Sequence, residues 1–192
     1  MGENAGLIIG IVVAVVVVLI IVISIVGWYI STLNNFRRMG VKIDEANSGI
    51  DVALTKRFDL LTKTIATVKG YAKHEEETLS KIIAMRNPGK GATLQEKQEF
   101  ANATTQALKS VNLVVEQYPT LKADNMFNNL QRSISEVEEN LQAARSNFNA
   151  NVSAFNKAIL QFPASVVAGA RFTRKDYFEA EVAKTQDVAM DF

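Results

Sequence analysis

Residues 7–26 read LIIGIVVAVVVVLIIVISIV, twenty residues without one charged side chain. In a helix they would rise about 30 Å, which matches the hydrocarbon core of a bilayer. Lone strands would leave unpaired backbone groups in lipid, so the Val and Ile content does not favour them. A buried helix in a soluble protein is the weaker alternative, because such long helices carry polar residues on some turns. The sequence therefore predicts a transmembrane helix over residues 7–29.

The flanks of this segment do not resemble a cleavable signal peptide. The start, MGENAG, is acidic rather than basic, and GWY follows at 27–29 where small cleavage-site residues would be expected. Trp28 and Tyr29 stand where aromatic anchors meet a membrane surface, and Arg37, Arg38 and Lys42 follow them. The positive-inside rule then predicts an uncleaved anchor with residues 1–6 outside and the C-terminal side in the cytoplasm.

Gly6, Gly10 and Ala14 recur every four residues at the start of the predicted span. Such a small-residue face lets two transmembrane helices approach closely. Glycine is also common in transmembrane helices without any packing role, and both interpretations stay open. If the face is used, it predicts a homo-oligomer.

The composition excludes several classes of site. The 192 residues include one His and no Cys, which rules out disulfides, thiolate metal sites and cysteine nucleophiles. A multi-histidine metal site is excluded as well, whereas an all-oxygen site for a hard cation is not. With 21 Lys and Arg against 20 Asp and Glu, nothing indicates a nucleic-acid-binding surface. We predict no cofactor, no metal and no nucleic acid partner.

The remainder of the chain has the pattern of an elongated antiparallel helical bundle, so the predicted fold is all-α. A first helix continues from the anchor to the turn Asn87–Gly91, with weak points at Gly40, Gly49 and Gly70, of which Gly40 is the expected place for a bend. Thr93 and Glu96 have the spacing of a capping box for a second helix that ends before Pro119. Short connections at 87–93 and 119–123 predict antiparallel neighbours. A third helix begins near Asp124, and its apolar stripe is Phe127, Leu130, Ile134, Val137, Leu141, Ala144, Phe148, Val152, Phe155, Ile159 and Phe162.

After Pro163 the pattern changes. A second capping signal at Thr173 predicts one or two short helices, with Phe172, Tyr177 and Phe178 closing the end of the bundle. Residues 181–192 have no pattern and are predicted to be a flexible tail. The predicted domains are therefore residues 1–6, the span 7–29, the bundle 30–180 and the tail 181–192.

Two groups of polar residues invite a chemical interpretation. His74 begins a metalloprotease-like run, but Thr78 stands where a second histidine is required, so a solvated helix surface is favoured. The first helix carries its own apolar stripe, which begins at Ile43 and includes Ile50, Leu54 and Leu61. Arg57 falls on the rim of this stripe and would need a carboxylate there, for which Glu136 and Glu138 are candidates. Neither a nucleophile elbow nor a phosphate-binding glycine loop is present, and we predict that the protein is not an enzyme.

Four blocks of sequence resemble the signature of the bacterial LemA family. They are IDVALTKRFDLL at 50–61 with TVKGYAKHE at 67–75, VVEQYPTLKA at 114–123, FNKAILQFP at 155–163 and YFE at 177–179. The resemblance assigns as signature residues Ile50, Asp51, Leu54, Arg57, Asp59, Leu60, Val68, Lys69, Gly70, Tyr71, His74, Glu75, Tyr118, Pro119, Asn156, Phe162, Pro163, Phe178 and Glu179.

The resemblance implies a single-pass protein of the bacterial inner membrane with a cytoplasmic helical bundle. It implies no biochemical activity, although some relatives are associated with magnetosome membrane formation. This sequence departs from the family at Asn47, where an aromatic residue is common, and at Thr62, where a proline is frequent.

Together these features predict a membrane-anchored scaffold. Its expected partners are the lipid bilayer, a second copy of the chain and unidentified membrane or cytoplasmic proteins. The alternative is a signalling or envelope-stress component whose bundle repacks when a partner binds.

Overall fold

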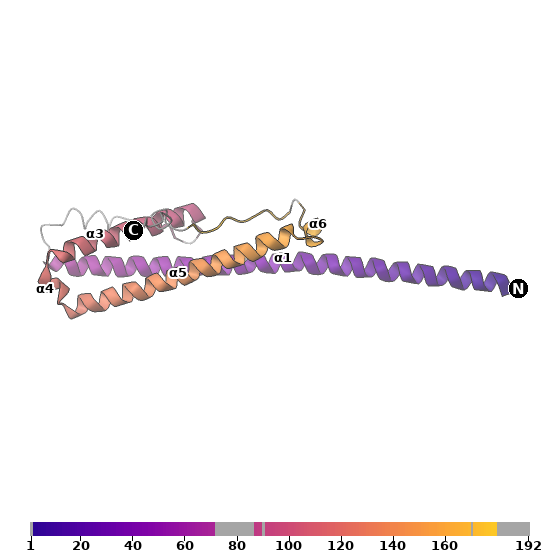
Figure 1. Cartoon of the computed structure of the whole chain (residues 1–192), viewed down its shortest axis with the longest axis horizontal. Coiled ribbons are helices and arrows are strands. Elements are labelled where there is room, and N and C mark those ends of the chain that lie inside the picture. The colour runs from indigo at the N-terminus through magenta and orange to yellow at the C-terminus, as the bar shows by residue number, and fades with distance from the viewer. Residues whose placement is uncertain (1, 72–86, 90, 170, 180–192) are drawn as a thin grey trace, which may run out of the picture. The chain divides into compact units, whose positions relative to one another are not determined.

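The structure is a computed structural model that describes residues 2–71, 87–89, 91–169 and 171–179 (Figure 1). No strand occurs among these residues, which confirms the all-α prediction. The contacts divide the chain into two units: the first comprises residues 1–42 and 153–175, and the second comprises residues 43–152 and 176–192. The described helices are α1 (Gly2–Tyr71), α3 (Leu94–Glu116), α4 (Pro119–Lys122), α5 (Asn125–Leu160) and α6 (Ala164–Ala168).

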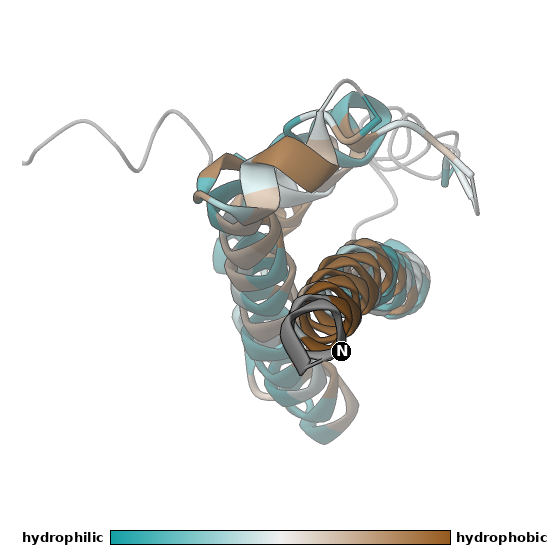
Figure 2. Ribbon diagram, turned by 90° about the vertical axis from the view of Figure 1, so that its right-hand side faces the viewer, coloured by the Kyte–Doolittle hydropathy of each residue, from teal (hydrophilic) through white to brown (hydrophobic). Residues whose placement is uncertain are grey.

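Helix α1 is unbroken over 70 residues and supplies both the apolar span and a core helix of the second unit. It passes through Gly40, where we expected a bend, without losing its helical hydrogen bonding. One glycine costs a helix only about 1 kcal/mol, and packing on either side offsets this. Figure 2 shows the strongly hydrophobic N-terminal part of α1 giving way to turns of mixed polarity. The predicted end of this helix near Asn87 follows residues outside the described part of the chain.

The core of the second unit is built from one face of each helix. The predicted apolar stripes supply it, because residues three and four apart share a helix face. One cluster of buried side chains in it comprises Leu61, Ile65, Val68, Ala107, Val111, Val114, Val115, Leu121 and Phe127. Helix α4 contributes Leu121 to this cluster and joins α3 to α5 within the short predicted turn (Figure 1).

The helix directions differ from the prediction for one pair. Asn47 of α1 contacts Lys97 of α3, and Arg57 contacts Thr104, so the residue numbers rise together and the two helices run parallel. We expected antiparallel neighbours from the short 87–93 turn. The chain instead passes Thr55 at Asn87, and α3 then starts close to Asn47, near the beginning of the second unit's part of α1. Helix α5 runs antiparallel to both, as predicted.

The start of α3 confirms the predicted capping box. The Thr93 hydroxyl accepts the Glu96 N–H at 3.2 Å, and the Glu96 carboxylate accepts the Thr93 N–H at 2.7 Å. The Thr93 hydroxyl also donates to the Glu96 carboxylate at 2.8 Å. The hydrogen bonds from the Thr93 N–H and hydroxyl lower the pKa of Glu96 below its usual value near 4.5, because these donors stabilise the charged carboxylate.

The core of the first unit is aromatic. Phe36 is 1% exposed, and its ring centroid lies 5.1 Å from that of Phe172, which lies 6.3 Å from that of Phe155. Phe36 precedes the predicted apolar stripe, which began at Ile43. Phe162 is 79% exposed, so its assignment to the apolar stripe of the third predicted helix was wrong. It lies beyond the end of α5 at Leu160, where helical spacing no longer sets its direction.

Residues 172–179 are not helical, which corrects the prediction of a helix capped by Thr173. Two asparagines of α5 hold the backbone of this segment instead. Within the first unit, Asn156 accepts the N–H of Lys175 and donates to its carbonyl, both at 2.9 Å. Within the second, Asn149 makes the same pair with Phe178 at 2.8 and 2.9 Å. These side-chain amides replace the hydrogen bonds that a helix would have formed.

The aromatic side chains of the segment have different outcomes. Phe172 and Phe178 are packed as predicted, whereas Tyr177 is 45% exposed and does not close the core. The predicted tail 181–192 lies outside the described residues.

Candidate functional site

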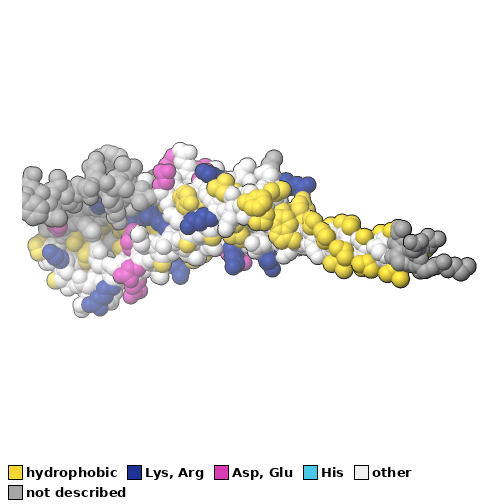
Figure 3. Space-filling view, turned by 45° about the vertical axis from the view of Figure 1, so that its right-hand side comes forward, with side chains coloured by type: hydrophobic (Ala, Val, Ile, Leu, Met, Phe, Trp, Pro, Cys, Tyr) yellow, Lys and Arg dark blue, Asp and Glu magenta, His cyan; other side chains and the backbone are white. Residues whose placement is uncertain are grey.

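The N-terminal part of α1 is long and apolar enough to cross a membrane. Its side chains at residues 8–27 are all exposed, and the hydrophobic surface is visible in Figure 3. Trp28 and Tyr29 follow the apolar run and are 40% and 38% exposed. The three basic residues of the predicted cytoplasmic flank, Arg37, Arg38 and Lys42, are all exposed.

The small-residue face lies on this uncovered surface. A side chain added at Gly10 would meet no atom within 4 Å, and Ala14 is exposed. The environment of Gly6 is outside the described side chains. The face is therefore available for a second helix at Gly10 and Ala14.

A buried guanidinium organises the centre of the second unit. Arg57 is 3% exposed, and its Nη1 donates to the carbonyl of Ala101 at 3.0 Å and to the Thr104 hydroxyl at 3.1 Å. Its Nη2 donates to the Thr105 hydroxyl at 2.9 Å and pairs with Glu138 Oε2 at 2.8 Å. One side chain of α1 thus joins α3 and α5.

This geometry confirms the sequence-based prediction for Arg57. Of the two candidate carboxylates, Glu138 is the partner, and Glu136 is exposed. Burial of an arginine requires such a partner because an unpaired charge in a protein interior is costly. The contacts run to both neighbouring helices, so they set the register among α1, α3 and α5.

A second buried cation was not predicted. Lys97 of α3 is 1% exposed, and its Nζ contacts Asp51 Oδ1 at 2.5 Å and Asn47 Oδ1 at 2.9 Å. Its position between Glu96 and Gln98 gave a strongly polar local sequence, so no apolar flank marked it as buried. Asn47, a departure from the family pattern, accepts a hydrogen bond from this ammonium group. The departure therefore has a structural use.

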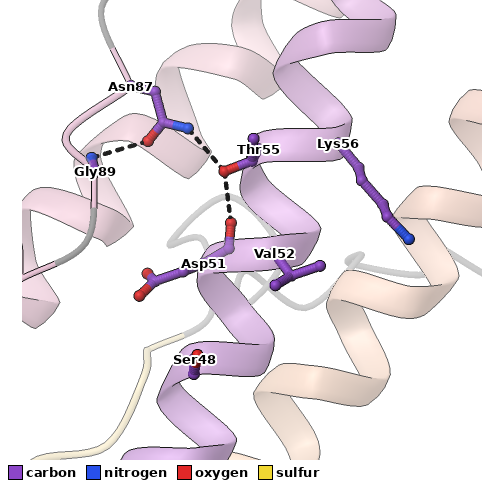
Figure 4. A pocket seen from close by; sticks show the side chains of 7 residues that line it. All are labelled: Ser48, Asp51, Val52, Thr55, Lys56, Asn87 and Gly89. Carbon is purple, nitrogen blue, oxygen red and sulfur yellow. Dashed lines mark hydrogen bonds between the residues drawn. The ribbon is translucent and has the colours of Figure 1, made fainter.

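A cavity of about 430 Å³ lies where residues 87–89 meet α1 (Figure 4). Asn87 donates to the Thr55 hydroxyl at 3.0 Å and accepts the N–H of Gly89, also at 3.0 Å. Both hydrogen bonds hold the loop against the helix, and φ of +80° at Gly89 suits glycine. The lining residues are Ser48, Asp51, Val52, Thr55, Lys56, Asn87 and Gly89. Three of the polar lining side chains already have partners within the protein, since Asp51 pairs with Lys97 and Asn87 is hydrogen-bonded to Thr55.

The structure places the signature residues in three settings. Ile50, Leu54, Arg57, Val68, Asn156 and Phe178 are buried, and Asp51, Leu60, Lys69 and Tyr118 are half-buried. Those at the surface are Asp59, Gly70, Pro119, Phe162, Pro163 and Glu179. His74 and Glu75 lie outside the described residues, as does the side chain of Tyr71. The buried and half-buried members hold the helices together, and the described residues do not bring the signature together around one cavity.

The geometry offers no site at which three acidic or histidine side chains of the described residues would hold a metal. The buried polar side chains hold elements of the fold together. Arg57 and Lys97 each connect helices through charged hydrogen bonds, and the two α5 asparagines hold a non-helical segment. Sequence patterns could have indicated the asparagines only weakly, because polar residues on a long helix are usually solvated.

Sequence comparisons give relatives for most of the chain. The model of the LemA family matches residues 46–192. "Protein LemA" of Metamycoplasma hominis is 30% identical over 142 residues, which are 73% of this chain and 65% of that protein. "Magnetosome protein MamQ" of Magnetospirillum gryphiswaldense is 29% identical over 108 residues, 55% of this chain and 37% of that protein. "Magnetosome protein MamQ 2" of Paramagnetospirillum magneticum is 32% identical over 78 residues, 40% and 29% of the respective chains. The chain thus spans less than two thirds of each relative.

Proposed function

Because this chain belongs to the LemA family, we propose that it is a non-enzymatic, single-pass scaffold of the bacterial inner membrane, with its helical bundle in the cytoplasm. The bundle presents a helical surface to protein partners, and the chain associates with itself through the span. Its relatives named magnetosome proteins are compatible with a structural role of this kind.

The observation that carries the proposal is the continuity of α1. The helix with the apolar span is the helix whose later turns carry Ile50, Leu54 and Leu61 into the bundle core. A contact made in the membrane and a contact made by the bundle therefore act on the same element. This is what a membrane scaffold requires, since lateral association raises the local concentration of the surfaces it presents.

The buried ionisable groups support a structural role. Arg57 and Lys97 are tied to side chains of neighbouring helices rather than aimed into an open cavity. Catalytic groups in contrast converge on a space that admits substrate.

The mass of the full-length protein in mild detergent tests self-association. We expect a discrete oligomer for the natural chain and a monomer for Gly10→Ile, because the larger side chain blocks close helix approach. Gly27→Ile is the matched control, since a side chain there also meets no atom within 4 Å but points from another helix face. A monomeric natural chain would contradict self-association and direct attention to a separate partner. Capture of such a partner only under membrane stress would favour the signalling alternative.

Orientation has its own test, which the absence of cysteine makes simple. Asn4→Cys and Ser135→Cys place single thiols on either side of the span, and Ser135 is exposed. A membrane-impermeant maleimide should label Asn4→Cys in intact cells and Ser135→Cys only after lysis. The reverse pattern would overturn the cytoplasmic placement.

A further inference from the structure

The first unit contains a surface that differs in charge from the remainder of the protein. Residues 28–42 and 153–175 carry seven Lys and Arg and no Asp or Glu. All seven side chains are exposed, and they are Arg37, Arg38, Lys42, Lys157, Arg171, Arg174 and Lys175. The charged side chains of this unit that follow the span are therefore all positive.

The same unit exposes a hydrophobic corner. Leu160 at the end of α5 is 56% exposed, Phe162 in the following turn is 79% exposed, and Val166 of α6 is 71% exposed. The opposite side of α6 is packed, since Val167 and Ala168 are 4% and 2% exposed. Helix α6 is thus held on one side while large apolar groups on the other remain uncovered. We call Leu160, Phe162 and Val166 the apolar corner.

The chain after α6 is tied to the end of the membrane span. Arg171 donates from Nη1 to the Tyr29 hydroxyl at 3.3 Å, and Phe172 packs on Phe36. Tyr29 is the residue expected at the membrane surface. Figure 3 shows hydrophobic side chains running along the first part of α1, and basic side chains appear only beyond this run.

We propose that the apolar corner and the seven basic side chains of the first unit form a second membrane contact, which binds an anionic phospholipid surface. The apolar groups enter the interface and the cations meet the lipid phosphates, the combination by which peripheral helices bind membranes. Charge complementarity favours an anionic lipid surface over a protein surface that lacks acidic residues. The contact with Tyr29 brings the apolar corner to the bilayer. The proposal rests on α1 spanning the membrane.

The test uses the full chain in lipid nanodiscs, with single cysteines that carry an environment-sensitive fluorophore. Val166→Cys reports on the corner, Ile20→Cys on the span and Ser135→Cys on the exposed surface of the second unit. Nitroxide-labelled lipids quench a fluorophore only where it contacts the bilayer. The discs contain phosphatidylcholine alone or with about 30 mol% phosphatidylglycerol, a bilayer that supplies the negative surface.

We expect strong quenching at Ile20→Cys in both lipids and none at Ser135→Cys. Quenching at Val166→Cys should be severalfold above that of Ser135→Cys, higher with phosphatidylglycerol, and reduced by 1 M salt because screening weakens the attraction. Quenching at Ile20→Cys without quenching at Val166→Cys would overturn the second contact alone. Absence of quenching at Ile20→Cys would overturn the membrane anchor and this inference with it. A Val166→Cys fluorophore that is shielded from water but not quenched would indicate a protein cover and also overturn the proposal.

Charge variants test the anionic component. Replacing Arg37, Arg38, Lys157 and Arg174 with Gln, in the Val166→Cys background, should remove the phosphatidylglycerol-dependent increase. Each charge removed should raise the ratio of detached to bound corner by roughly fivefold. The matched control replaces four exposed cations of the second unit, Lys63, Lys109, Lys122 and Arg132, and should retain the increase. Equal losses in both variants would overturn the assignment to the first unit.

Discussion

The two units place their Lys and Arg side chains in opposite environments. In the second, residues 43–152 carry 13 Lys and Arg with 14 Asp and Glu, and Arg57 and Lys97 are buried against carboxylates. In the first, residues 28–42 and 153–175 have no acidic residue, and all seven cations are exposed. In the described part of this protein a cation is therefore buried in a helix interface only where a carboxylate lies within contact distance, since burial of an unpaired charge costs too much free energy.

The largest expected effect comes from Arg57→Ala. We expect the free energy of unfolding to fall by about 3–5 kcal/mol, because the change leaves a cavity and removes the link to Glu138. Urea unfolding of the detergent-solubilised chain, followed by circular dichroism, measures this loss.

Arg57→Met separates charge from packing at the same position. It restores much of the volume without the charge, so its destabilisation should be clearly smaller than that of Arg57→Ala. If Arg57→Ala cost less than about 1 kcal/mol, the buried cation would not organise the helices and the contrast between the units would lose its main support.

Lys97→Met is expected to have the next largest effect. It leaves the half-buried Asp51 carboxylate and the Asn47 carbonyl without the ammonium group, at about 2–3 kcal/mol. The double variant Asp51→Asn with Lys97→Met provides the control in the same unfolding measurement. If Asp51 and Lys97 stabilise the fold as a pair, the double variant should cost less than the sum of its single changes.

These two cations also mark what the sequence could predict. Arg57 stood on the rim of a visible apolar stripe, so helix periodicity predicted that it needs a carboxylate, with Glu136 and Glu138 as candidates, and the structure identifies Glu138. Lys97 stood in a polar run after a capping box, and only the parallel contact of α3 with Asn47 buries it. Periodicity reports which face of one helix is apolar, but it does not report which neighbour covers that face.

The same limit explains the other differences. The short turn before Thr93 predicted an antiparallel pair, but the contacts of Asn87 with Thr55 and of Lys97 with Asn47 show that α3 starts beside an earlier part of α1 and runs parallel to it. The capping signal at Thr173 was overridden by long-range hydrogen bonds from Asn156. Local signals were reliable where the competing contacts were local, as at Thr93, and failed where residues distant in sequence supplied the hydrogen bonds.

Thr93→Ala should have a smaller effect, about 1 kcal/mol at pH 7, through the loss of the α3 cap. The pKa of Glu96 is lowered in the folded protein, so its share of this stabilisation is present above the unfolded value near 4.5. This contribution of Glu96 is lost as the pH falls through its lowered pKa in the folded protein. The difference in unfolding free energy between the natural chain and Thr93→Ala should therefore narrow below pH 4.5. A constant difference down to pH 3 would contradict the hydrogen bond from the Thr93 hydroxyl to the Glu96 carboxylate, which this variant removes while the backbone N–H donor remains.

The smallest expected effect is at the exposed cations of the first unit. Replacing Arg37, Arg38 and Lys42 with Gln should change the unfolding free energy by less than about 0.5 kcal/mol per site, since water solvates these side chains in both states. In detergent without anionic lipid, the substitutions remove the mutual repulsion of these cations, so we expect a slight stabilisation at low salt. A loss comparable to that of Lys97→Met would mean that these cations have protein partners. If the substitutions instead leave the unfolding free energy unchanged and abolish the contact with anionic lipid, positive charge has two separate uses in this chain: one in helix packing and one in lipid binding.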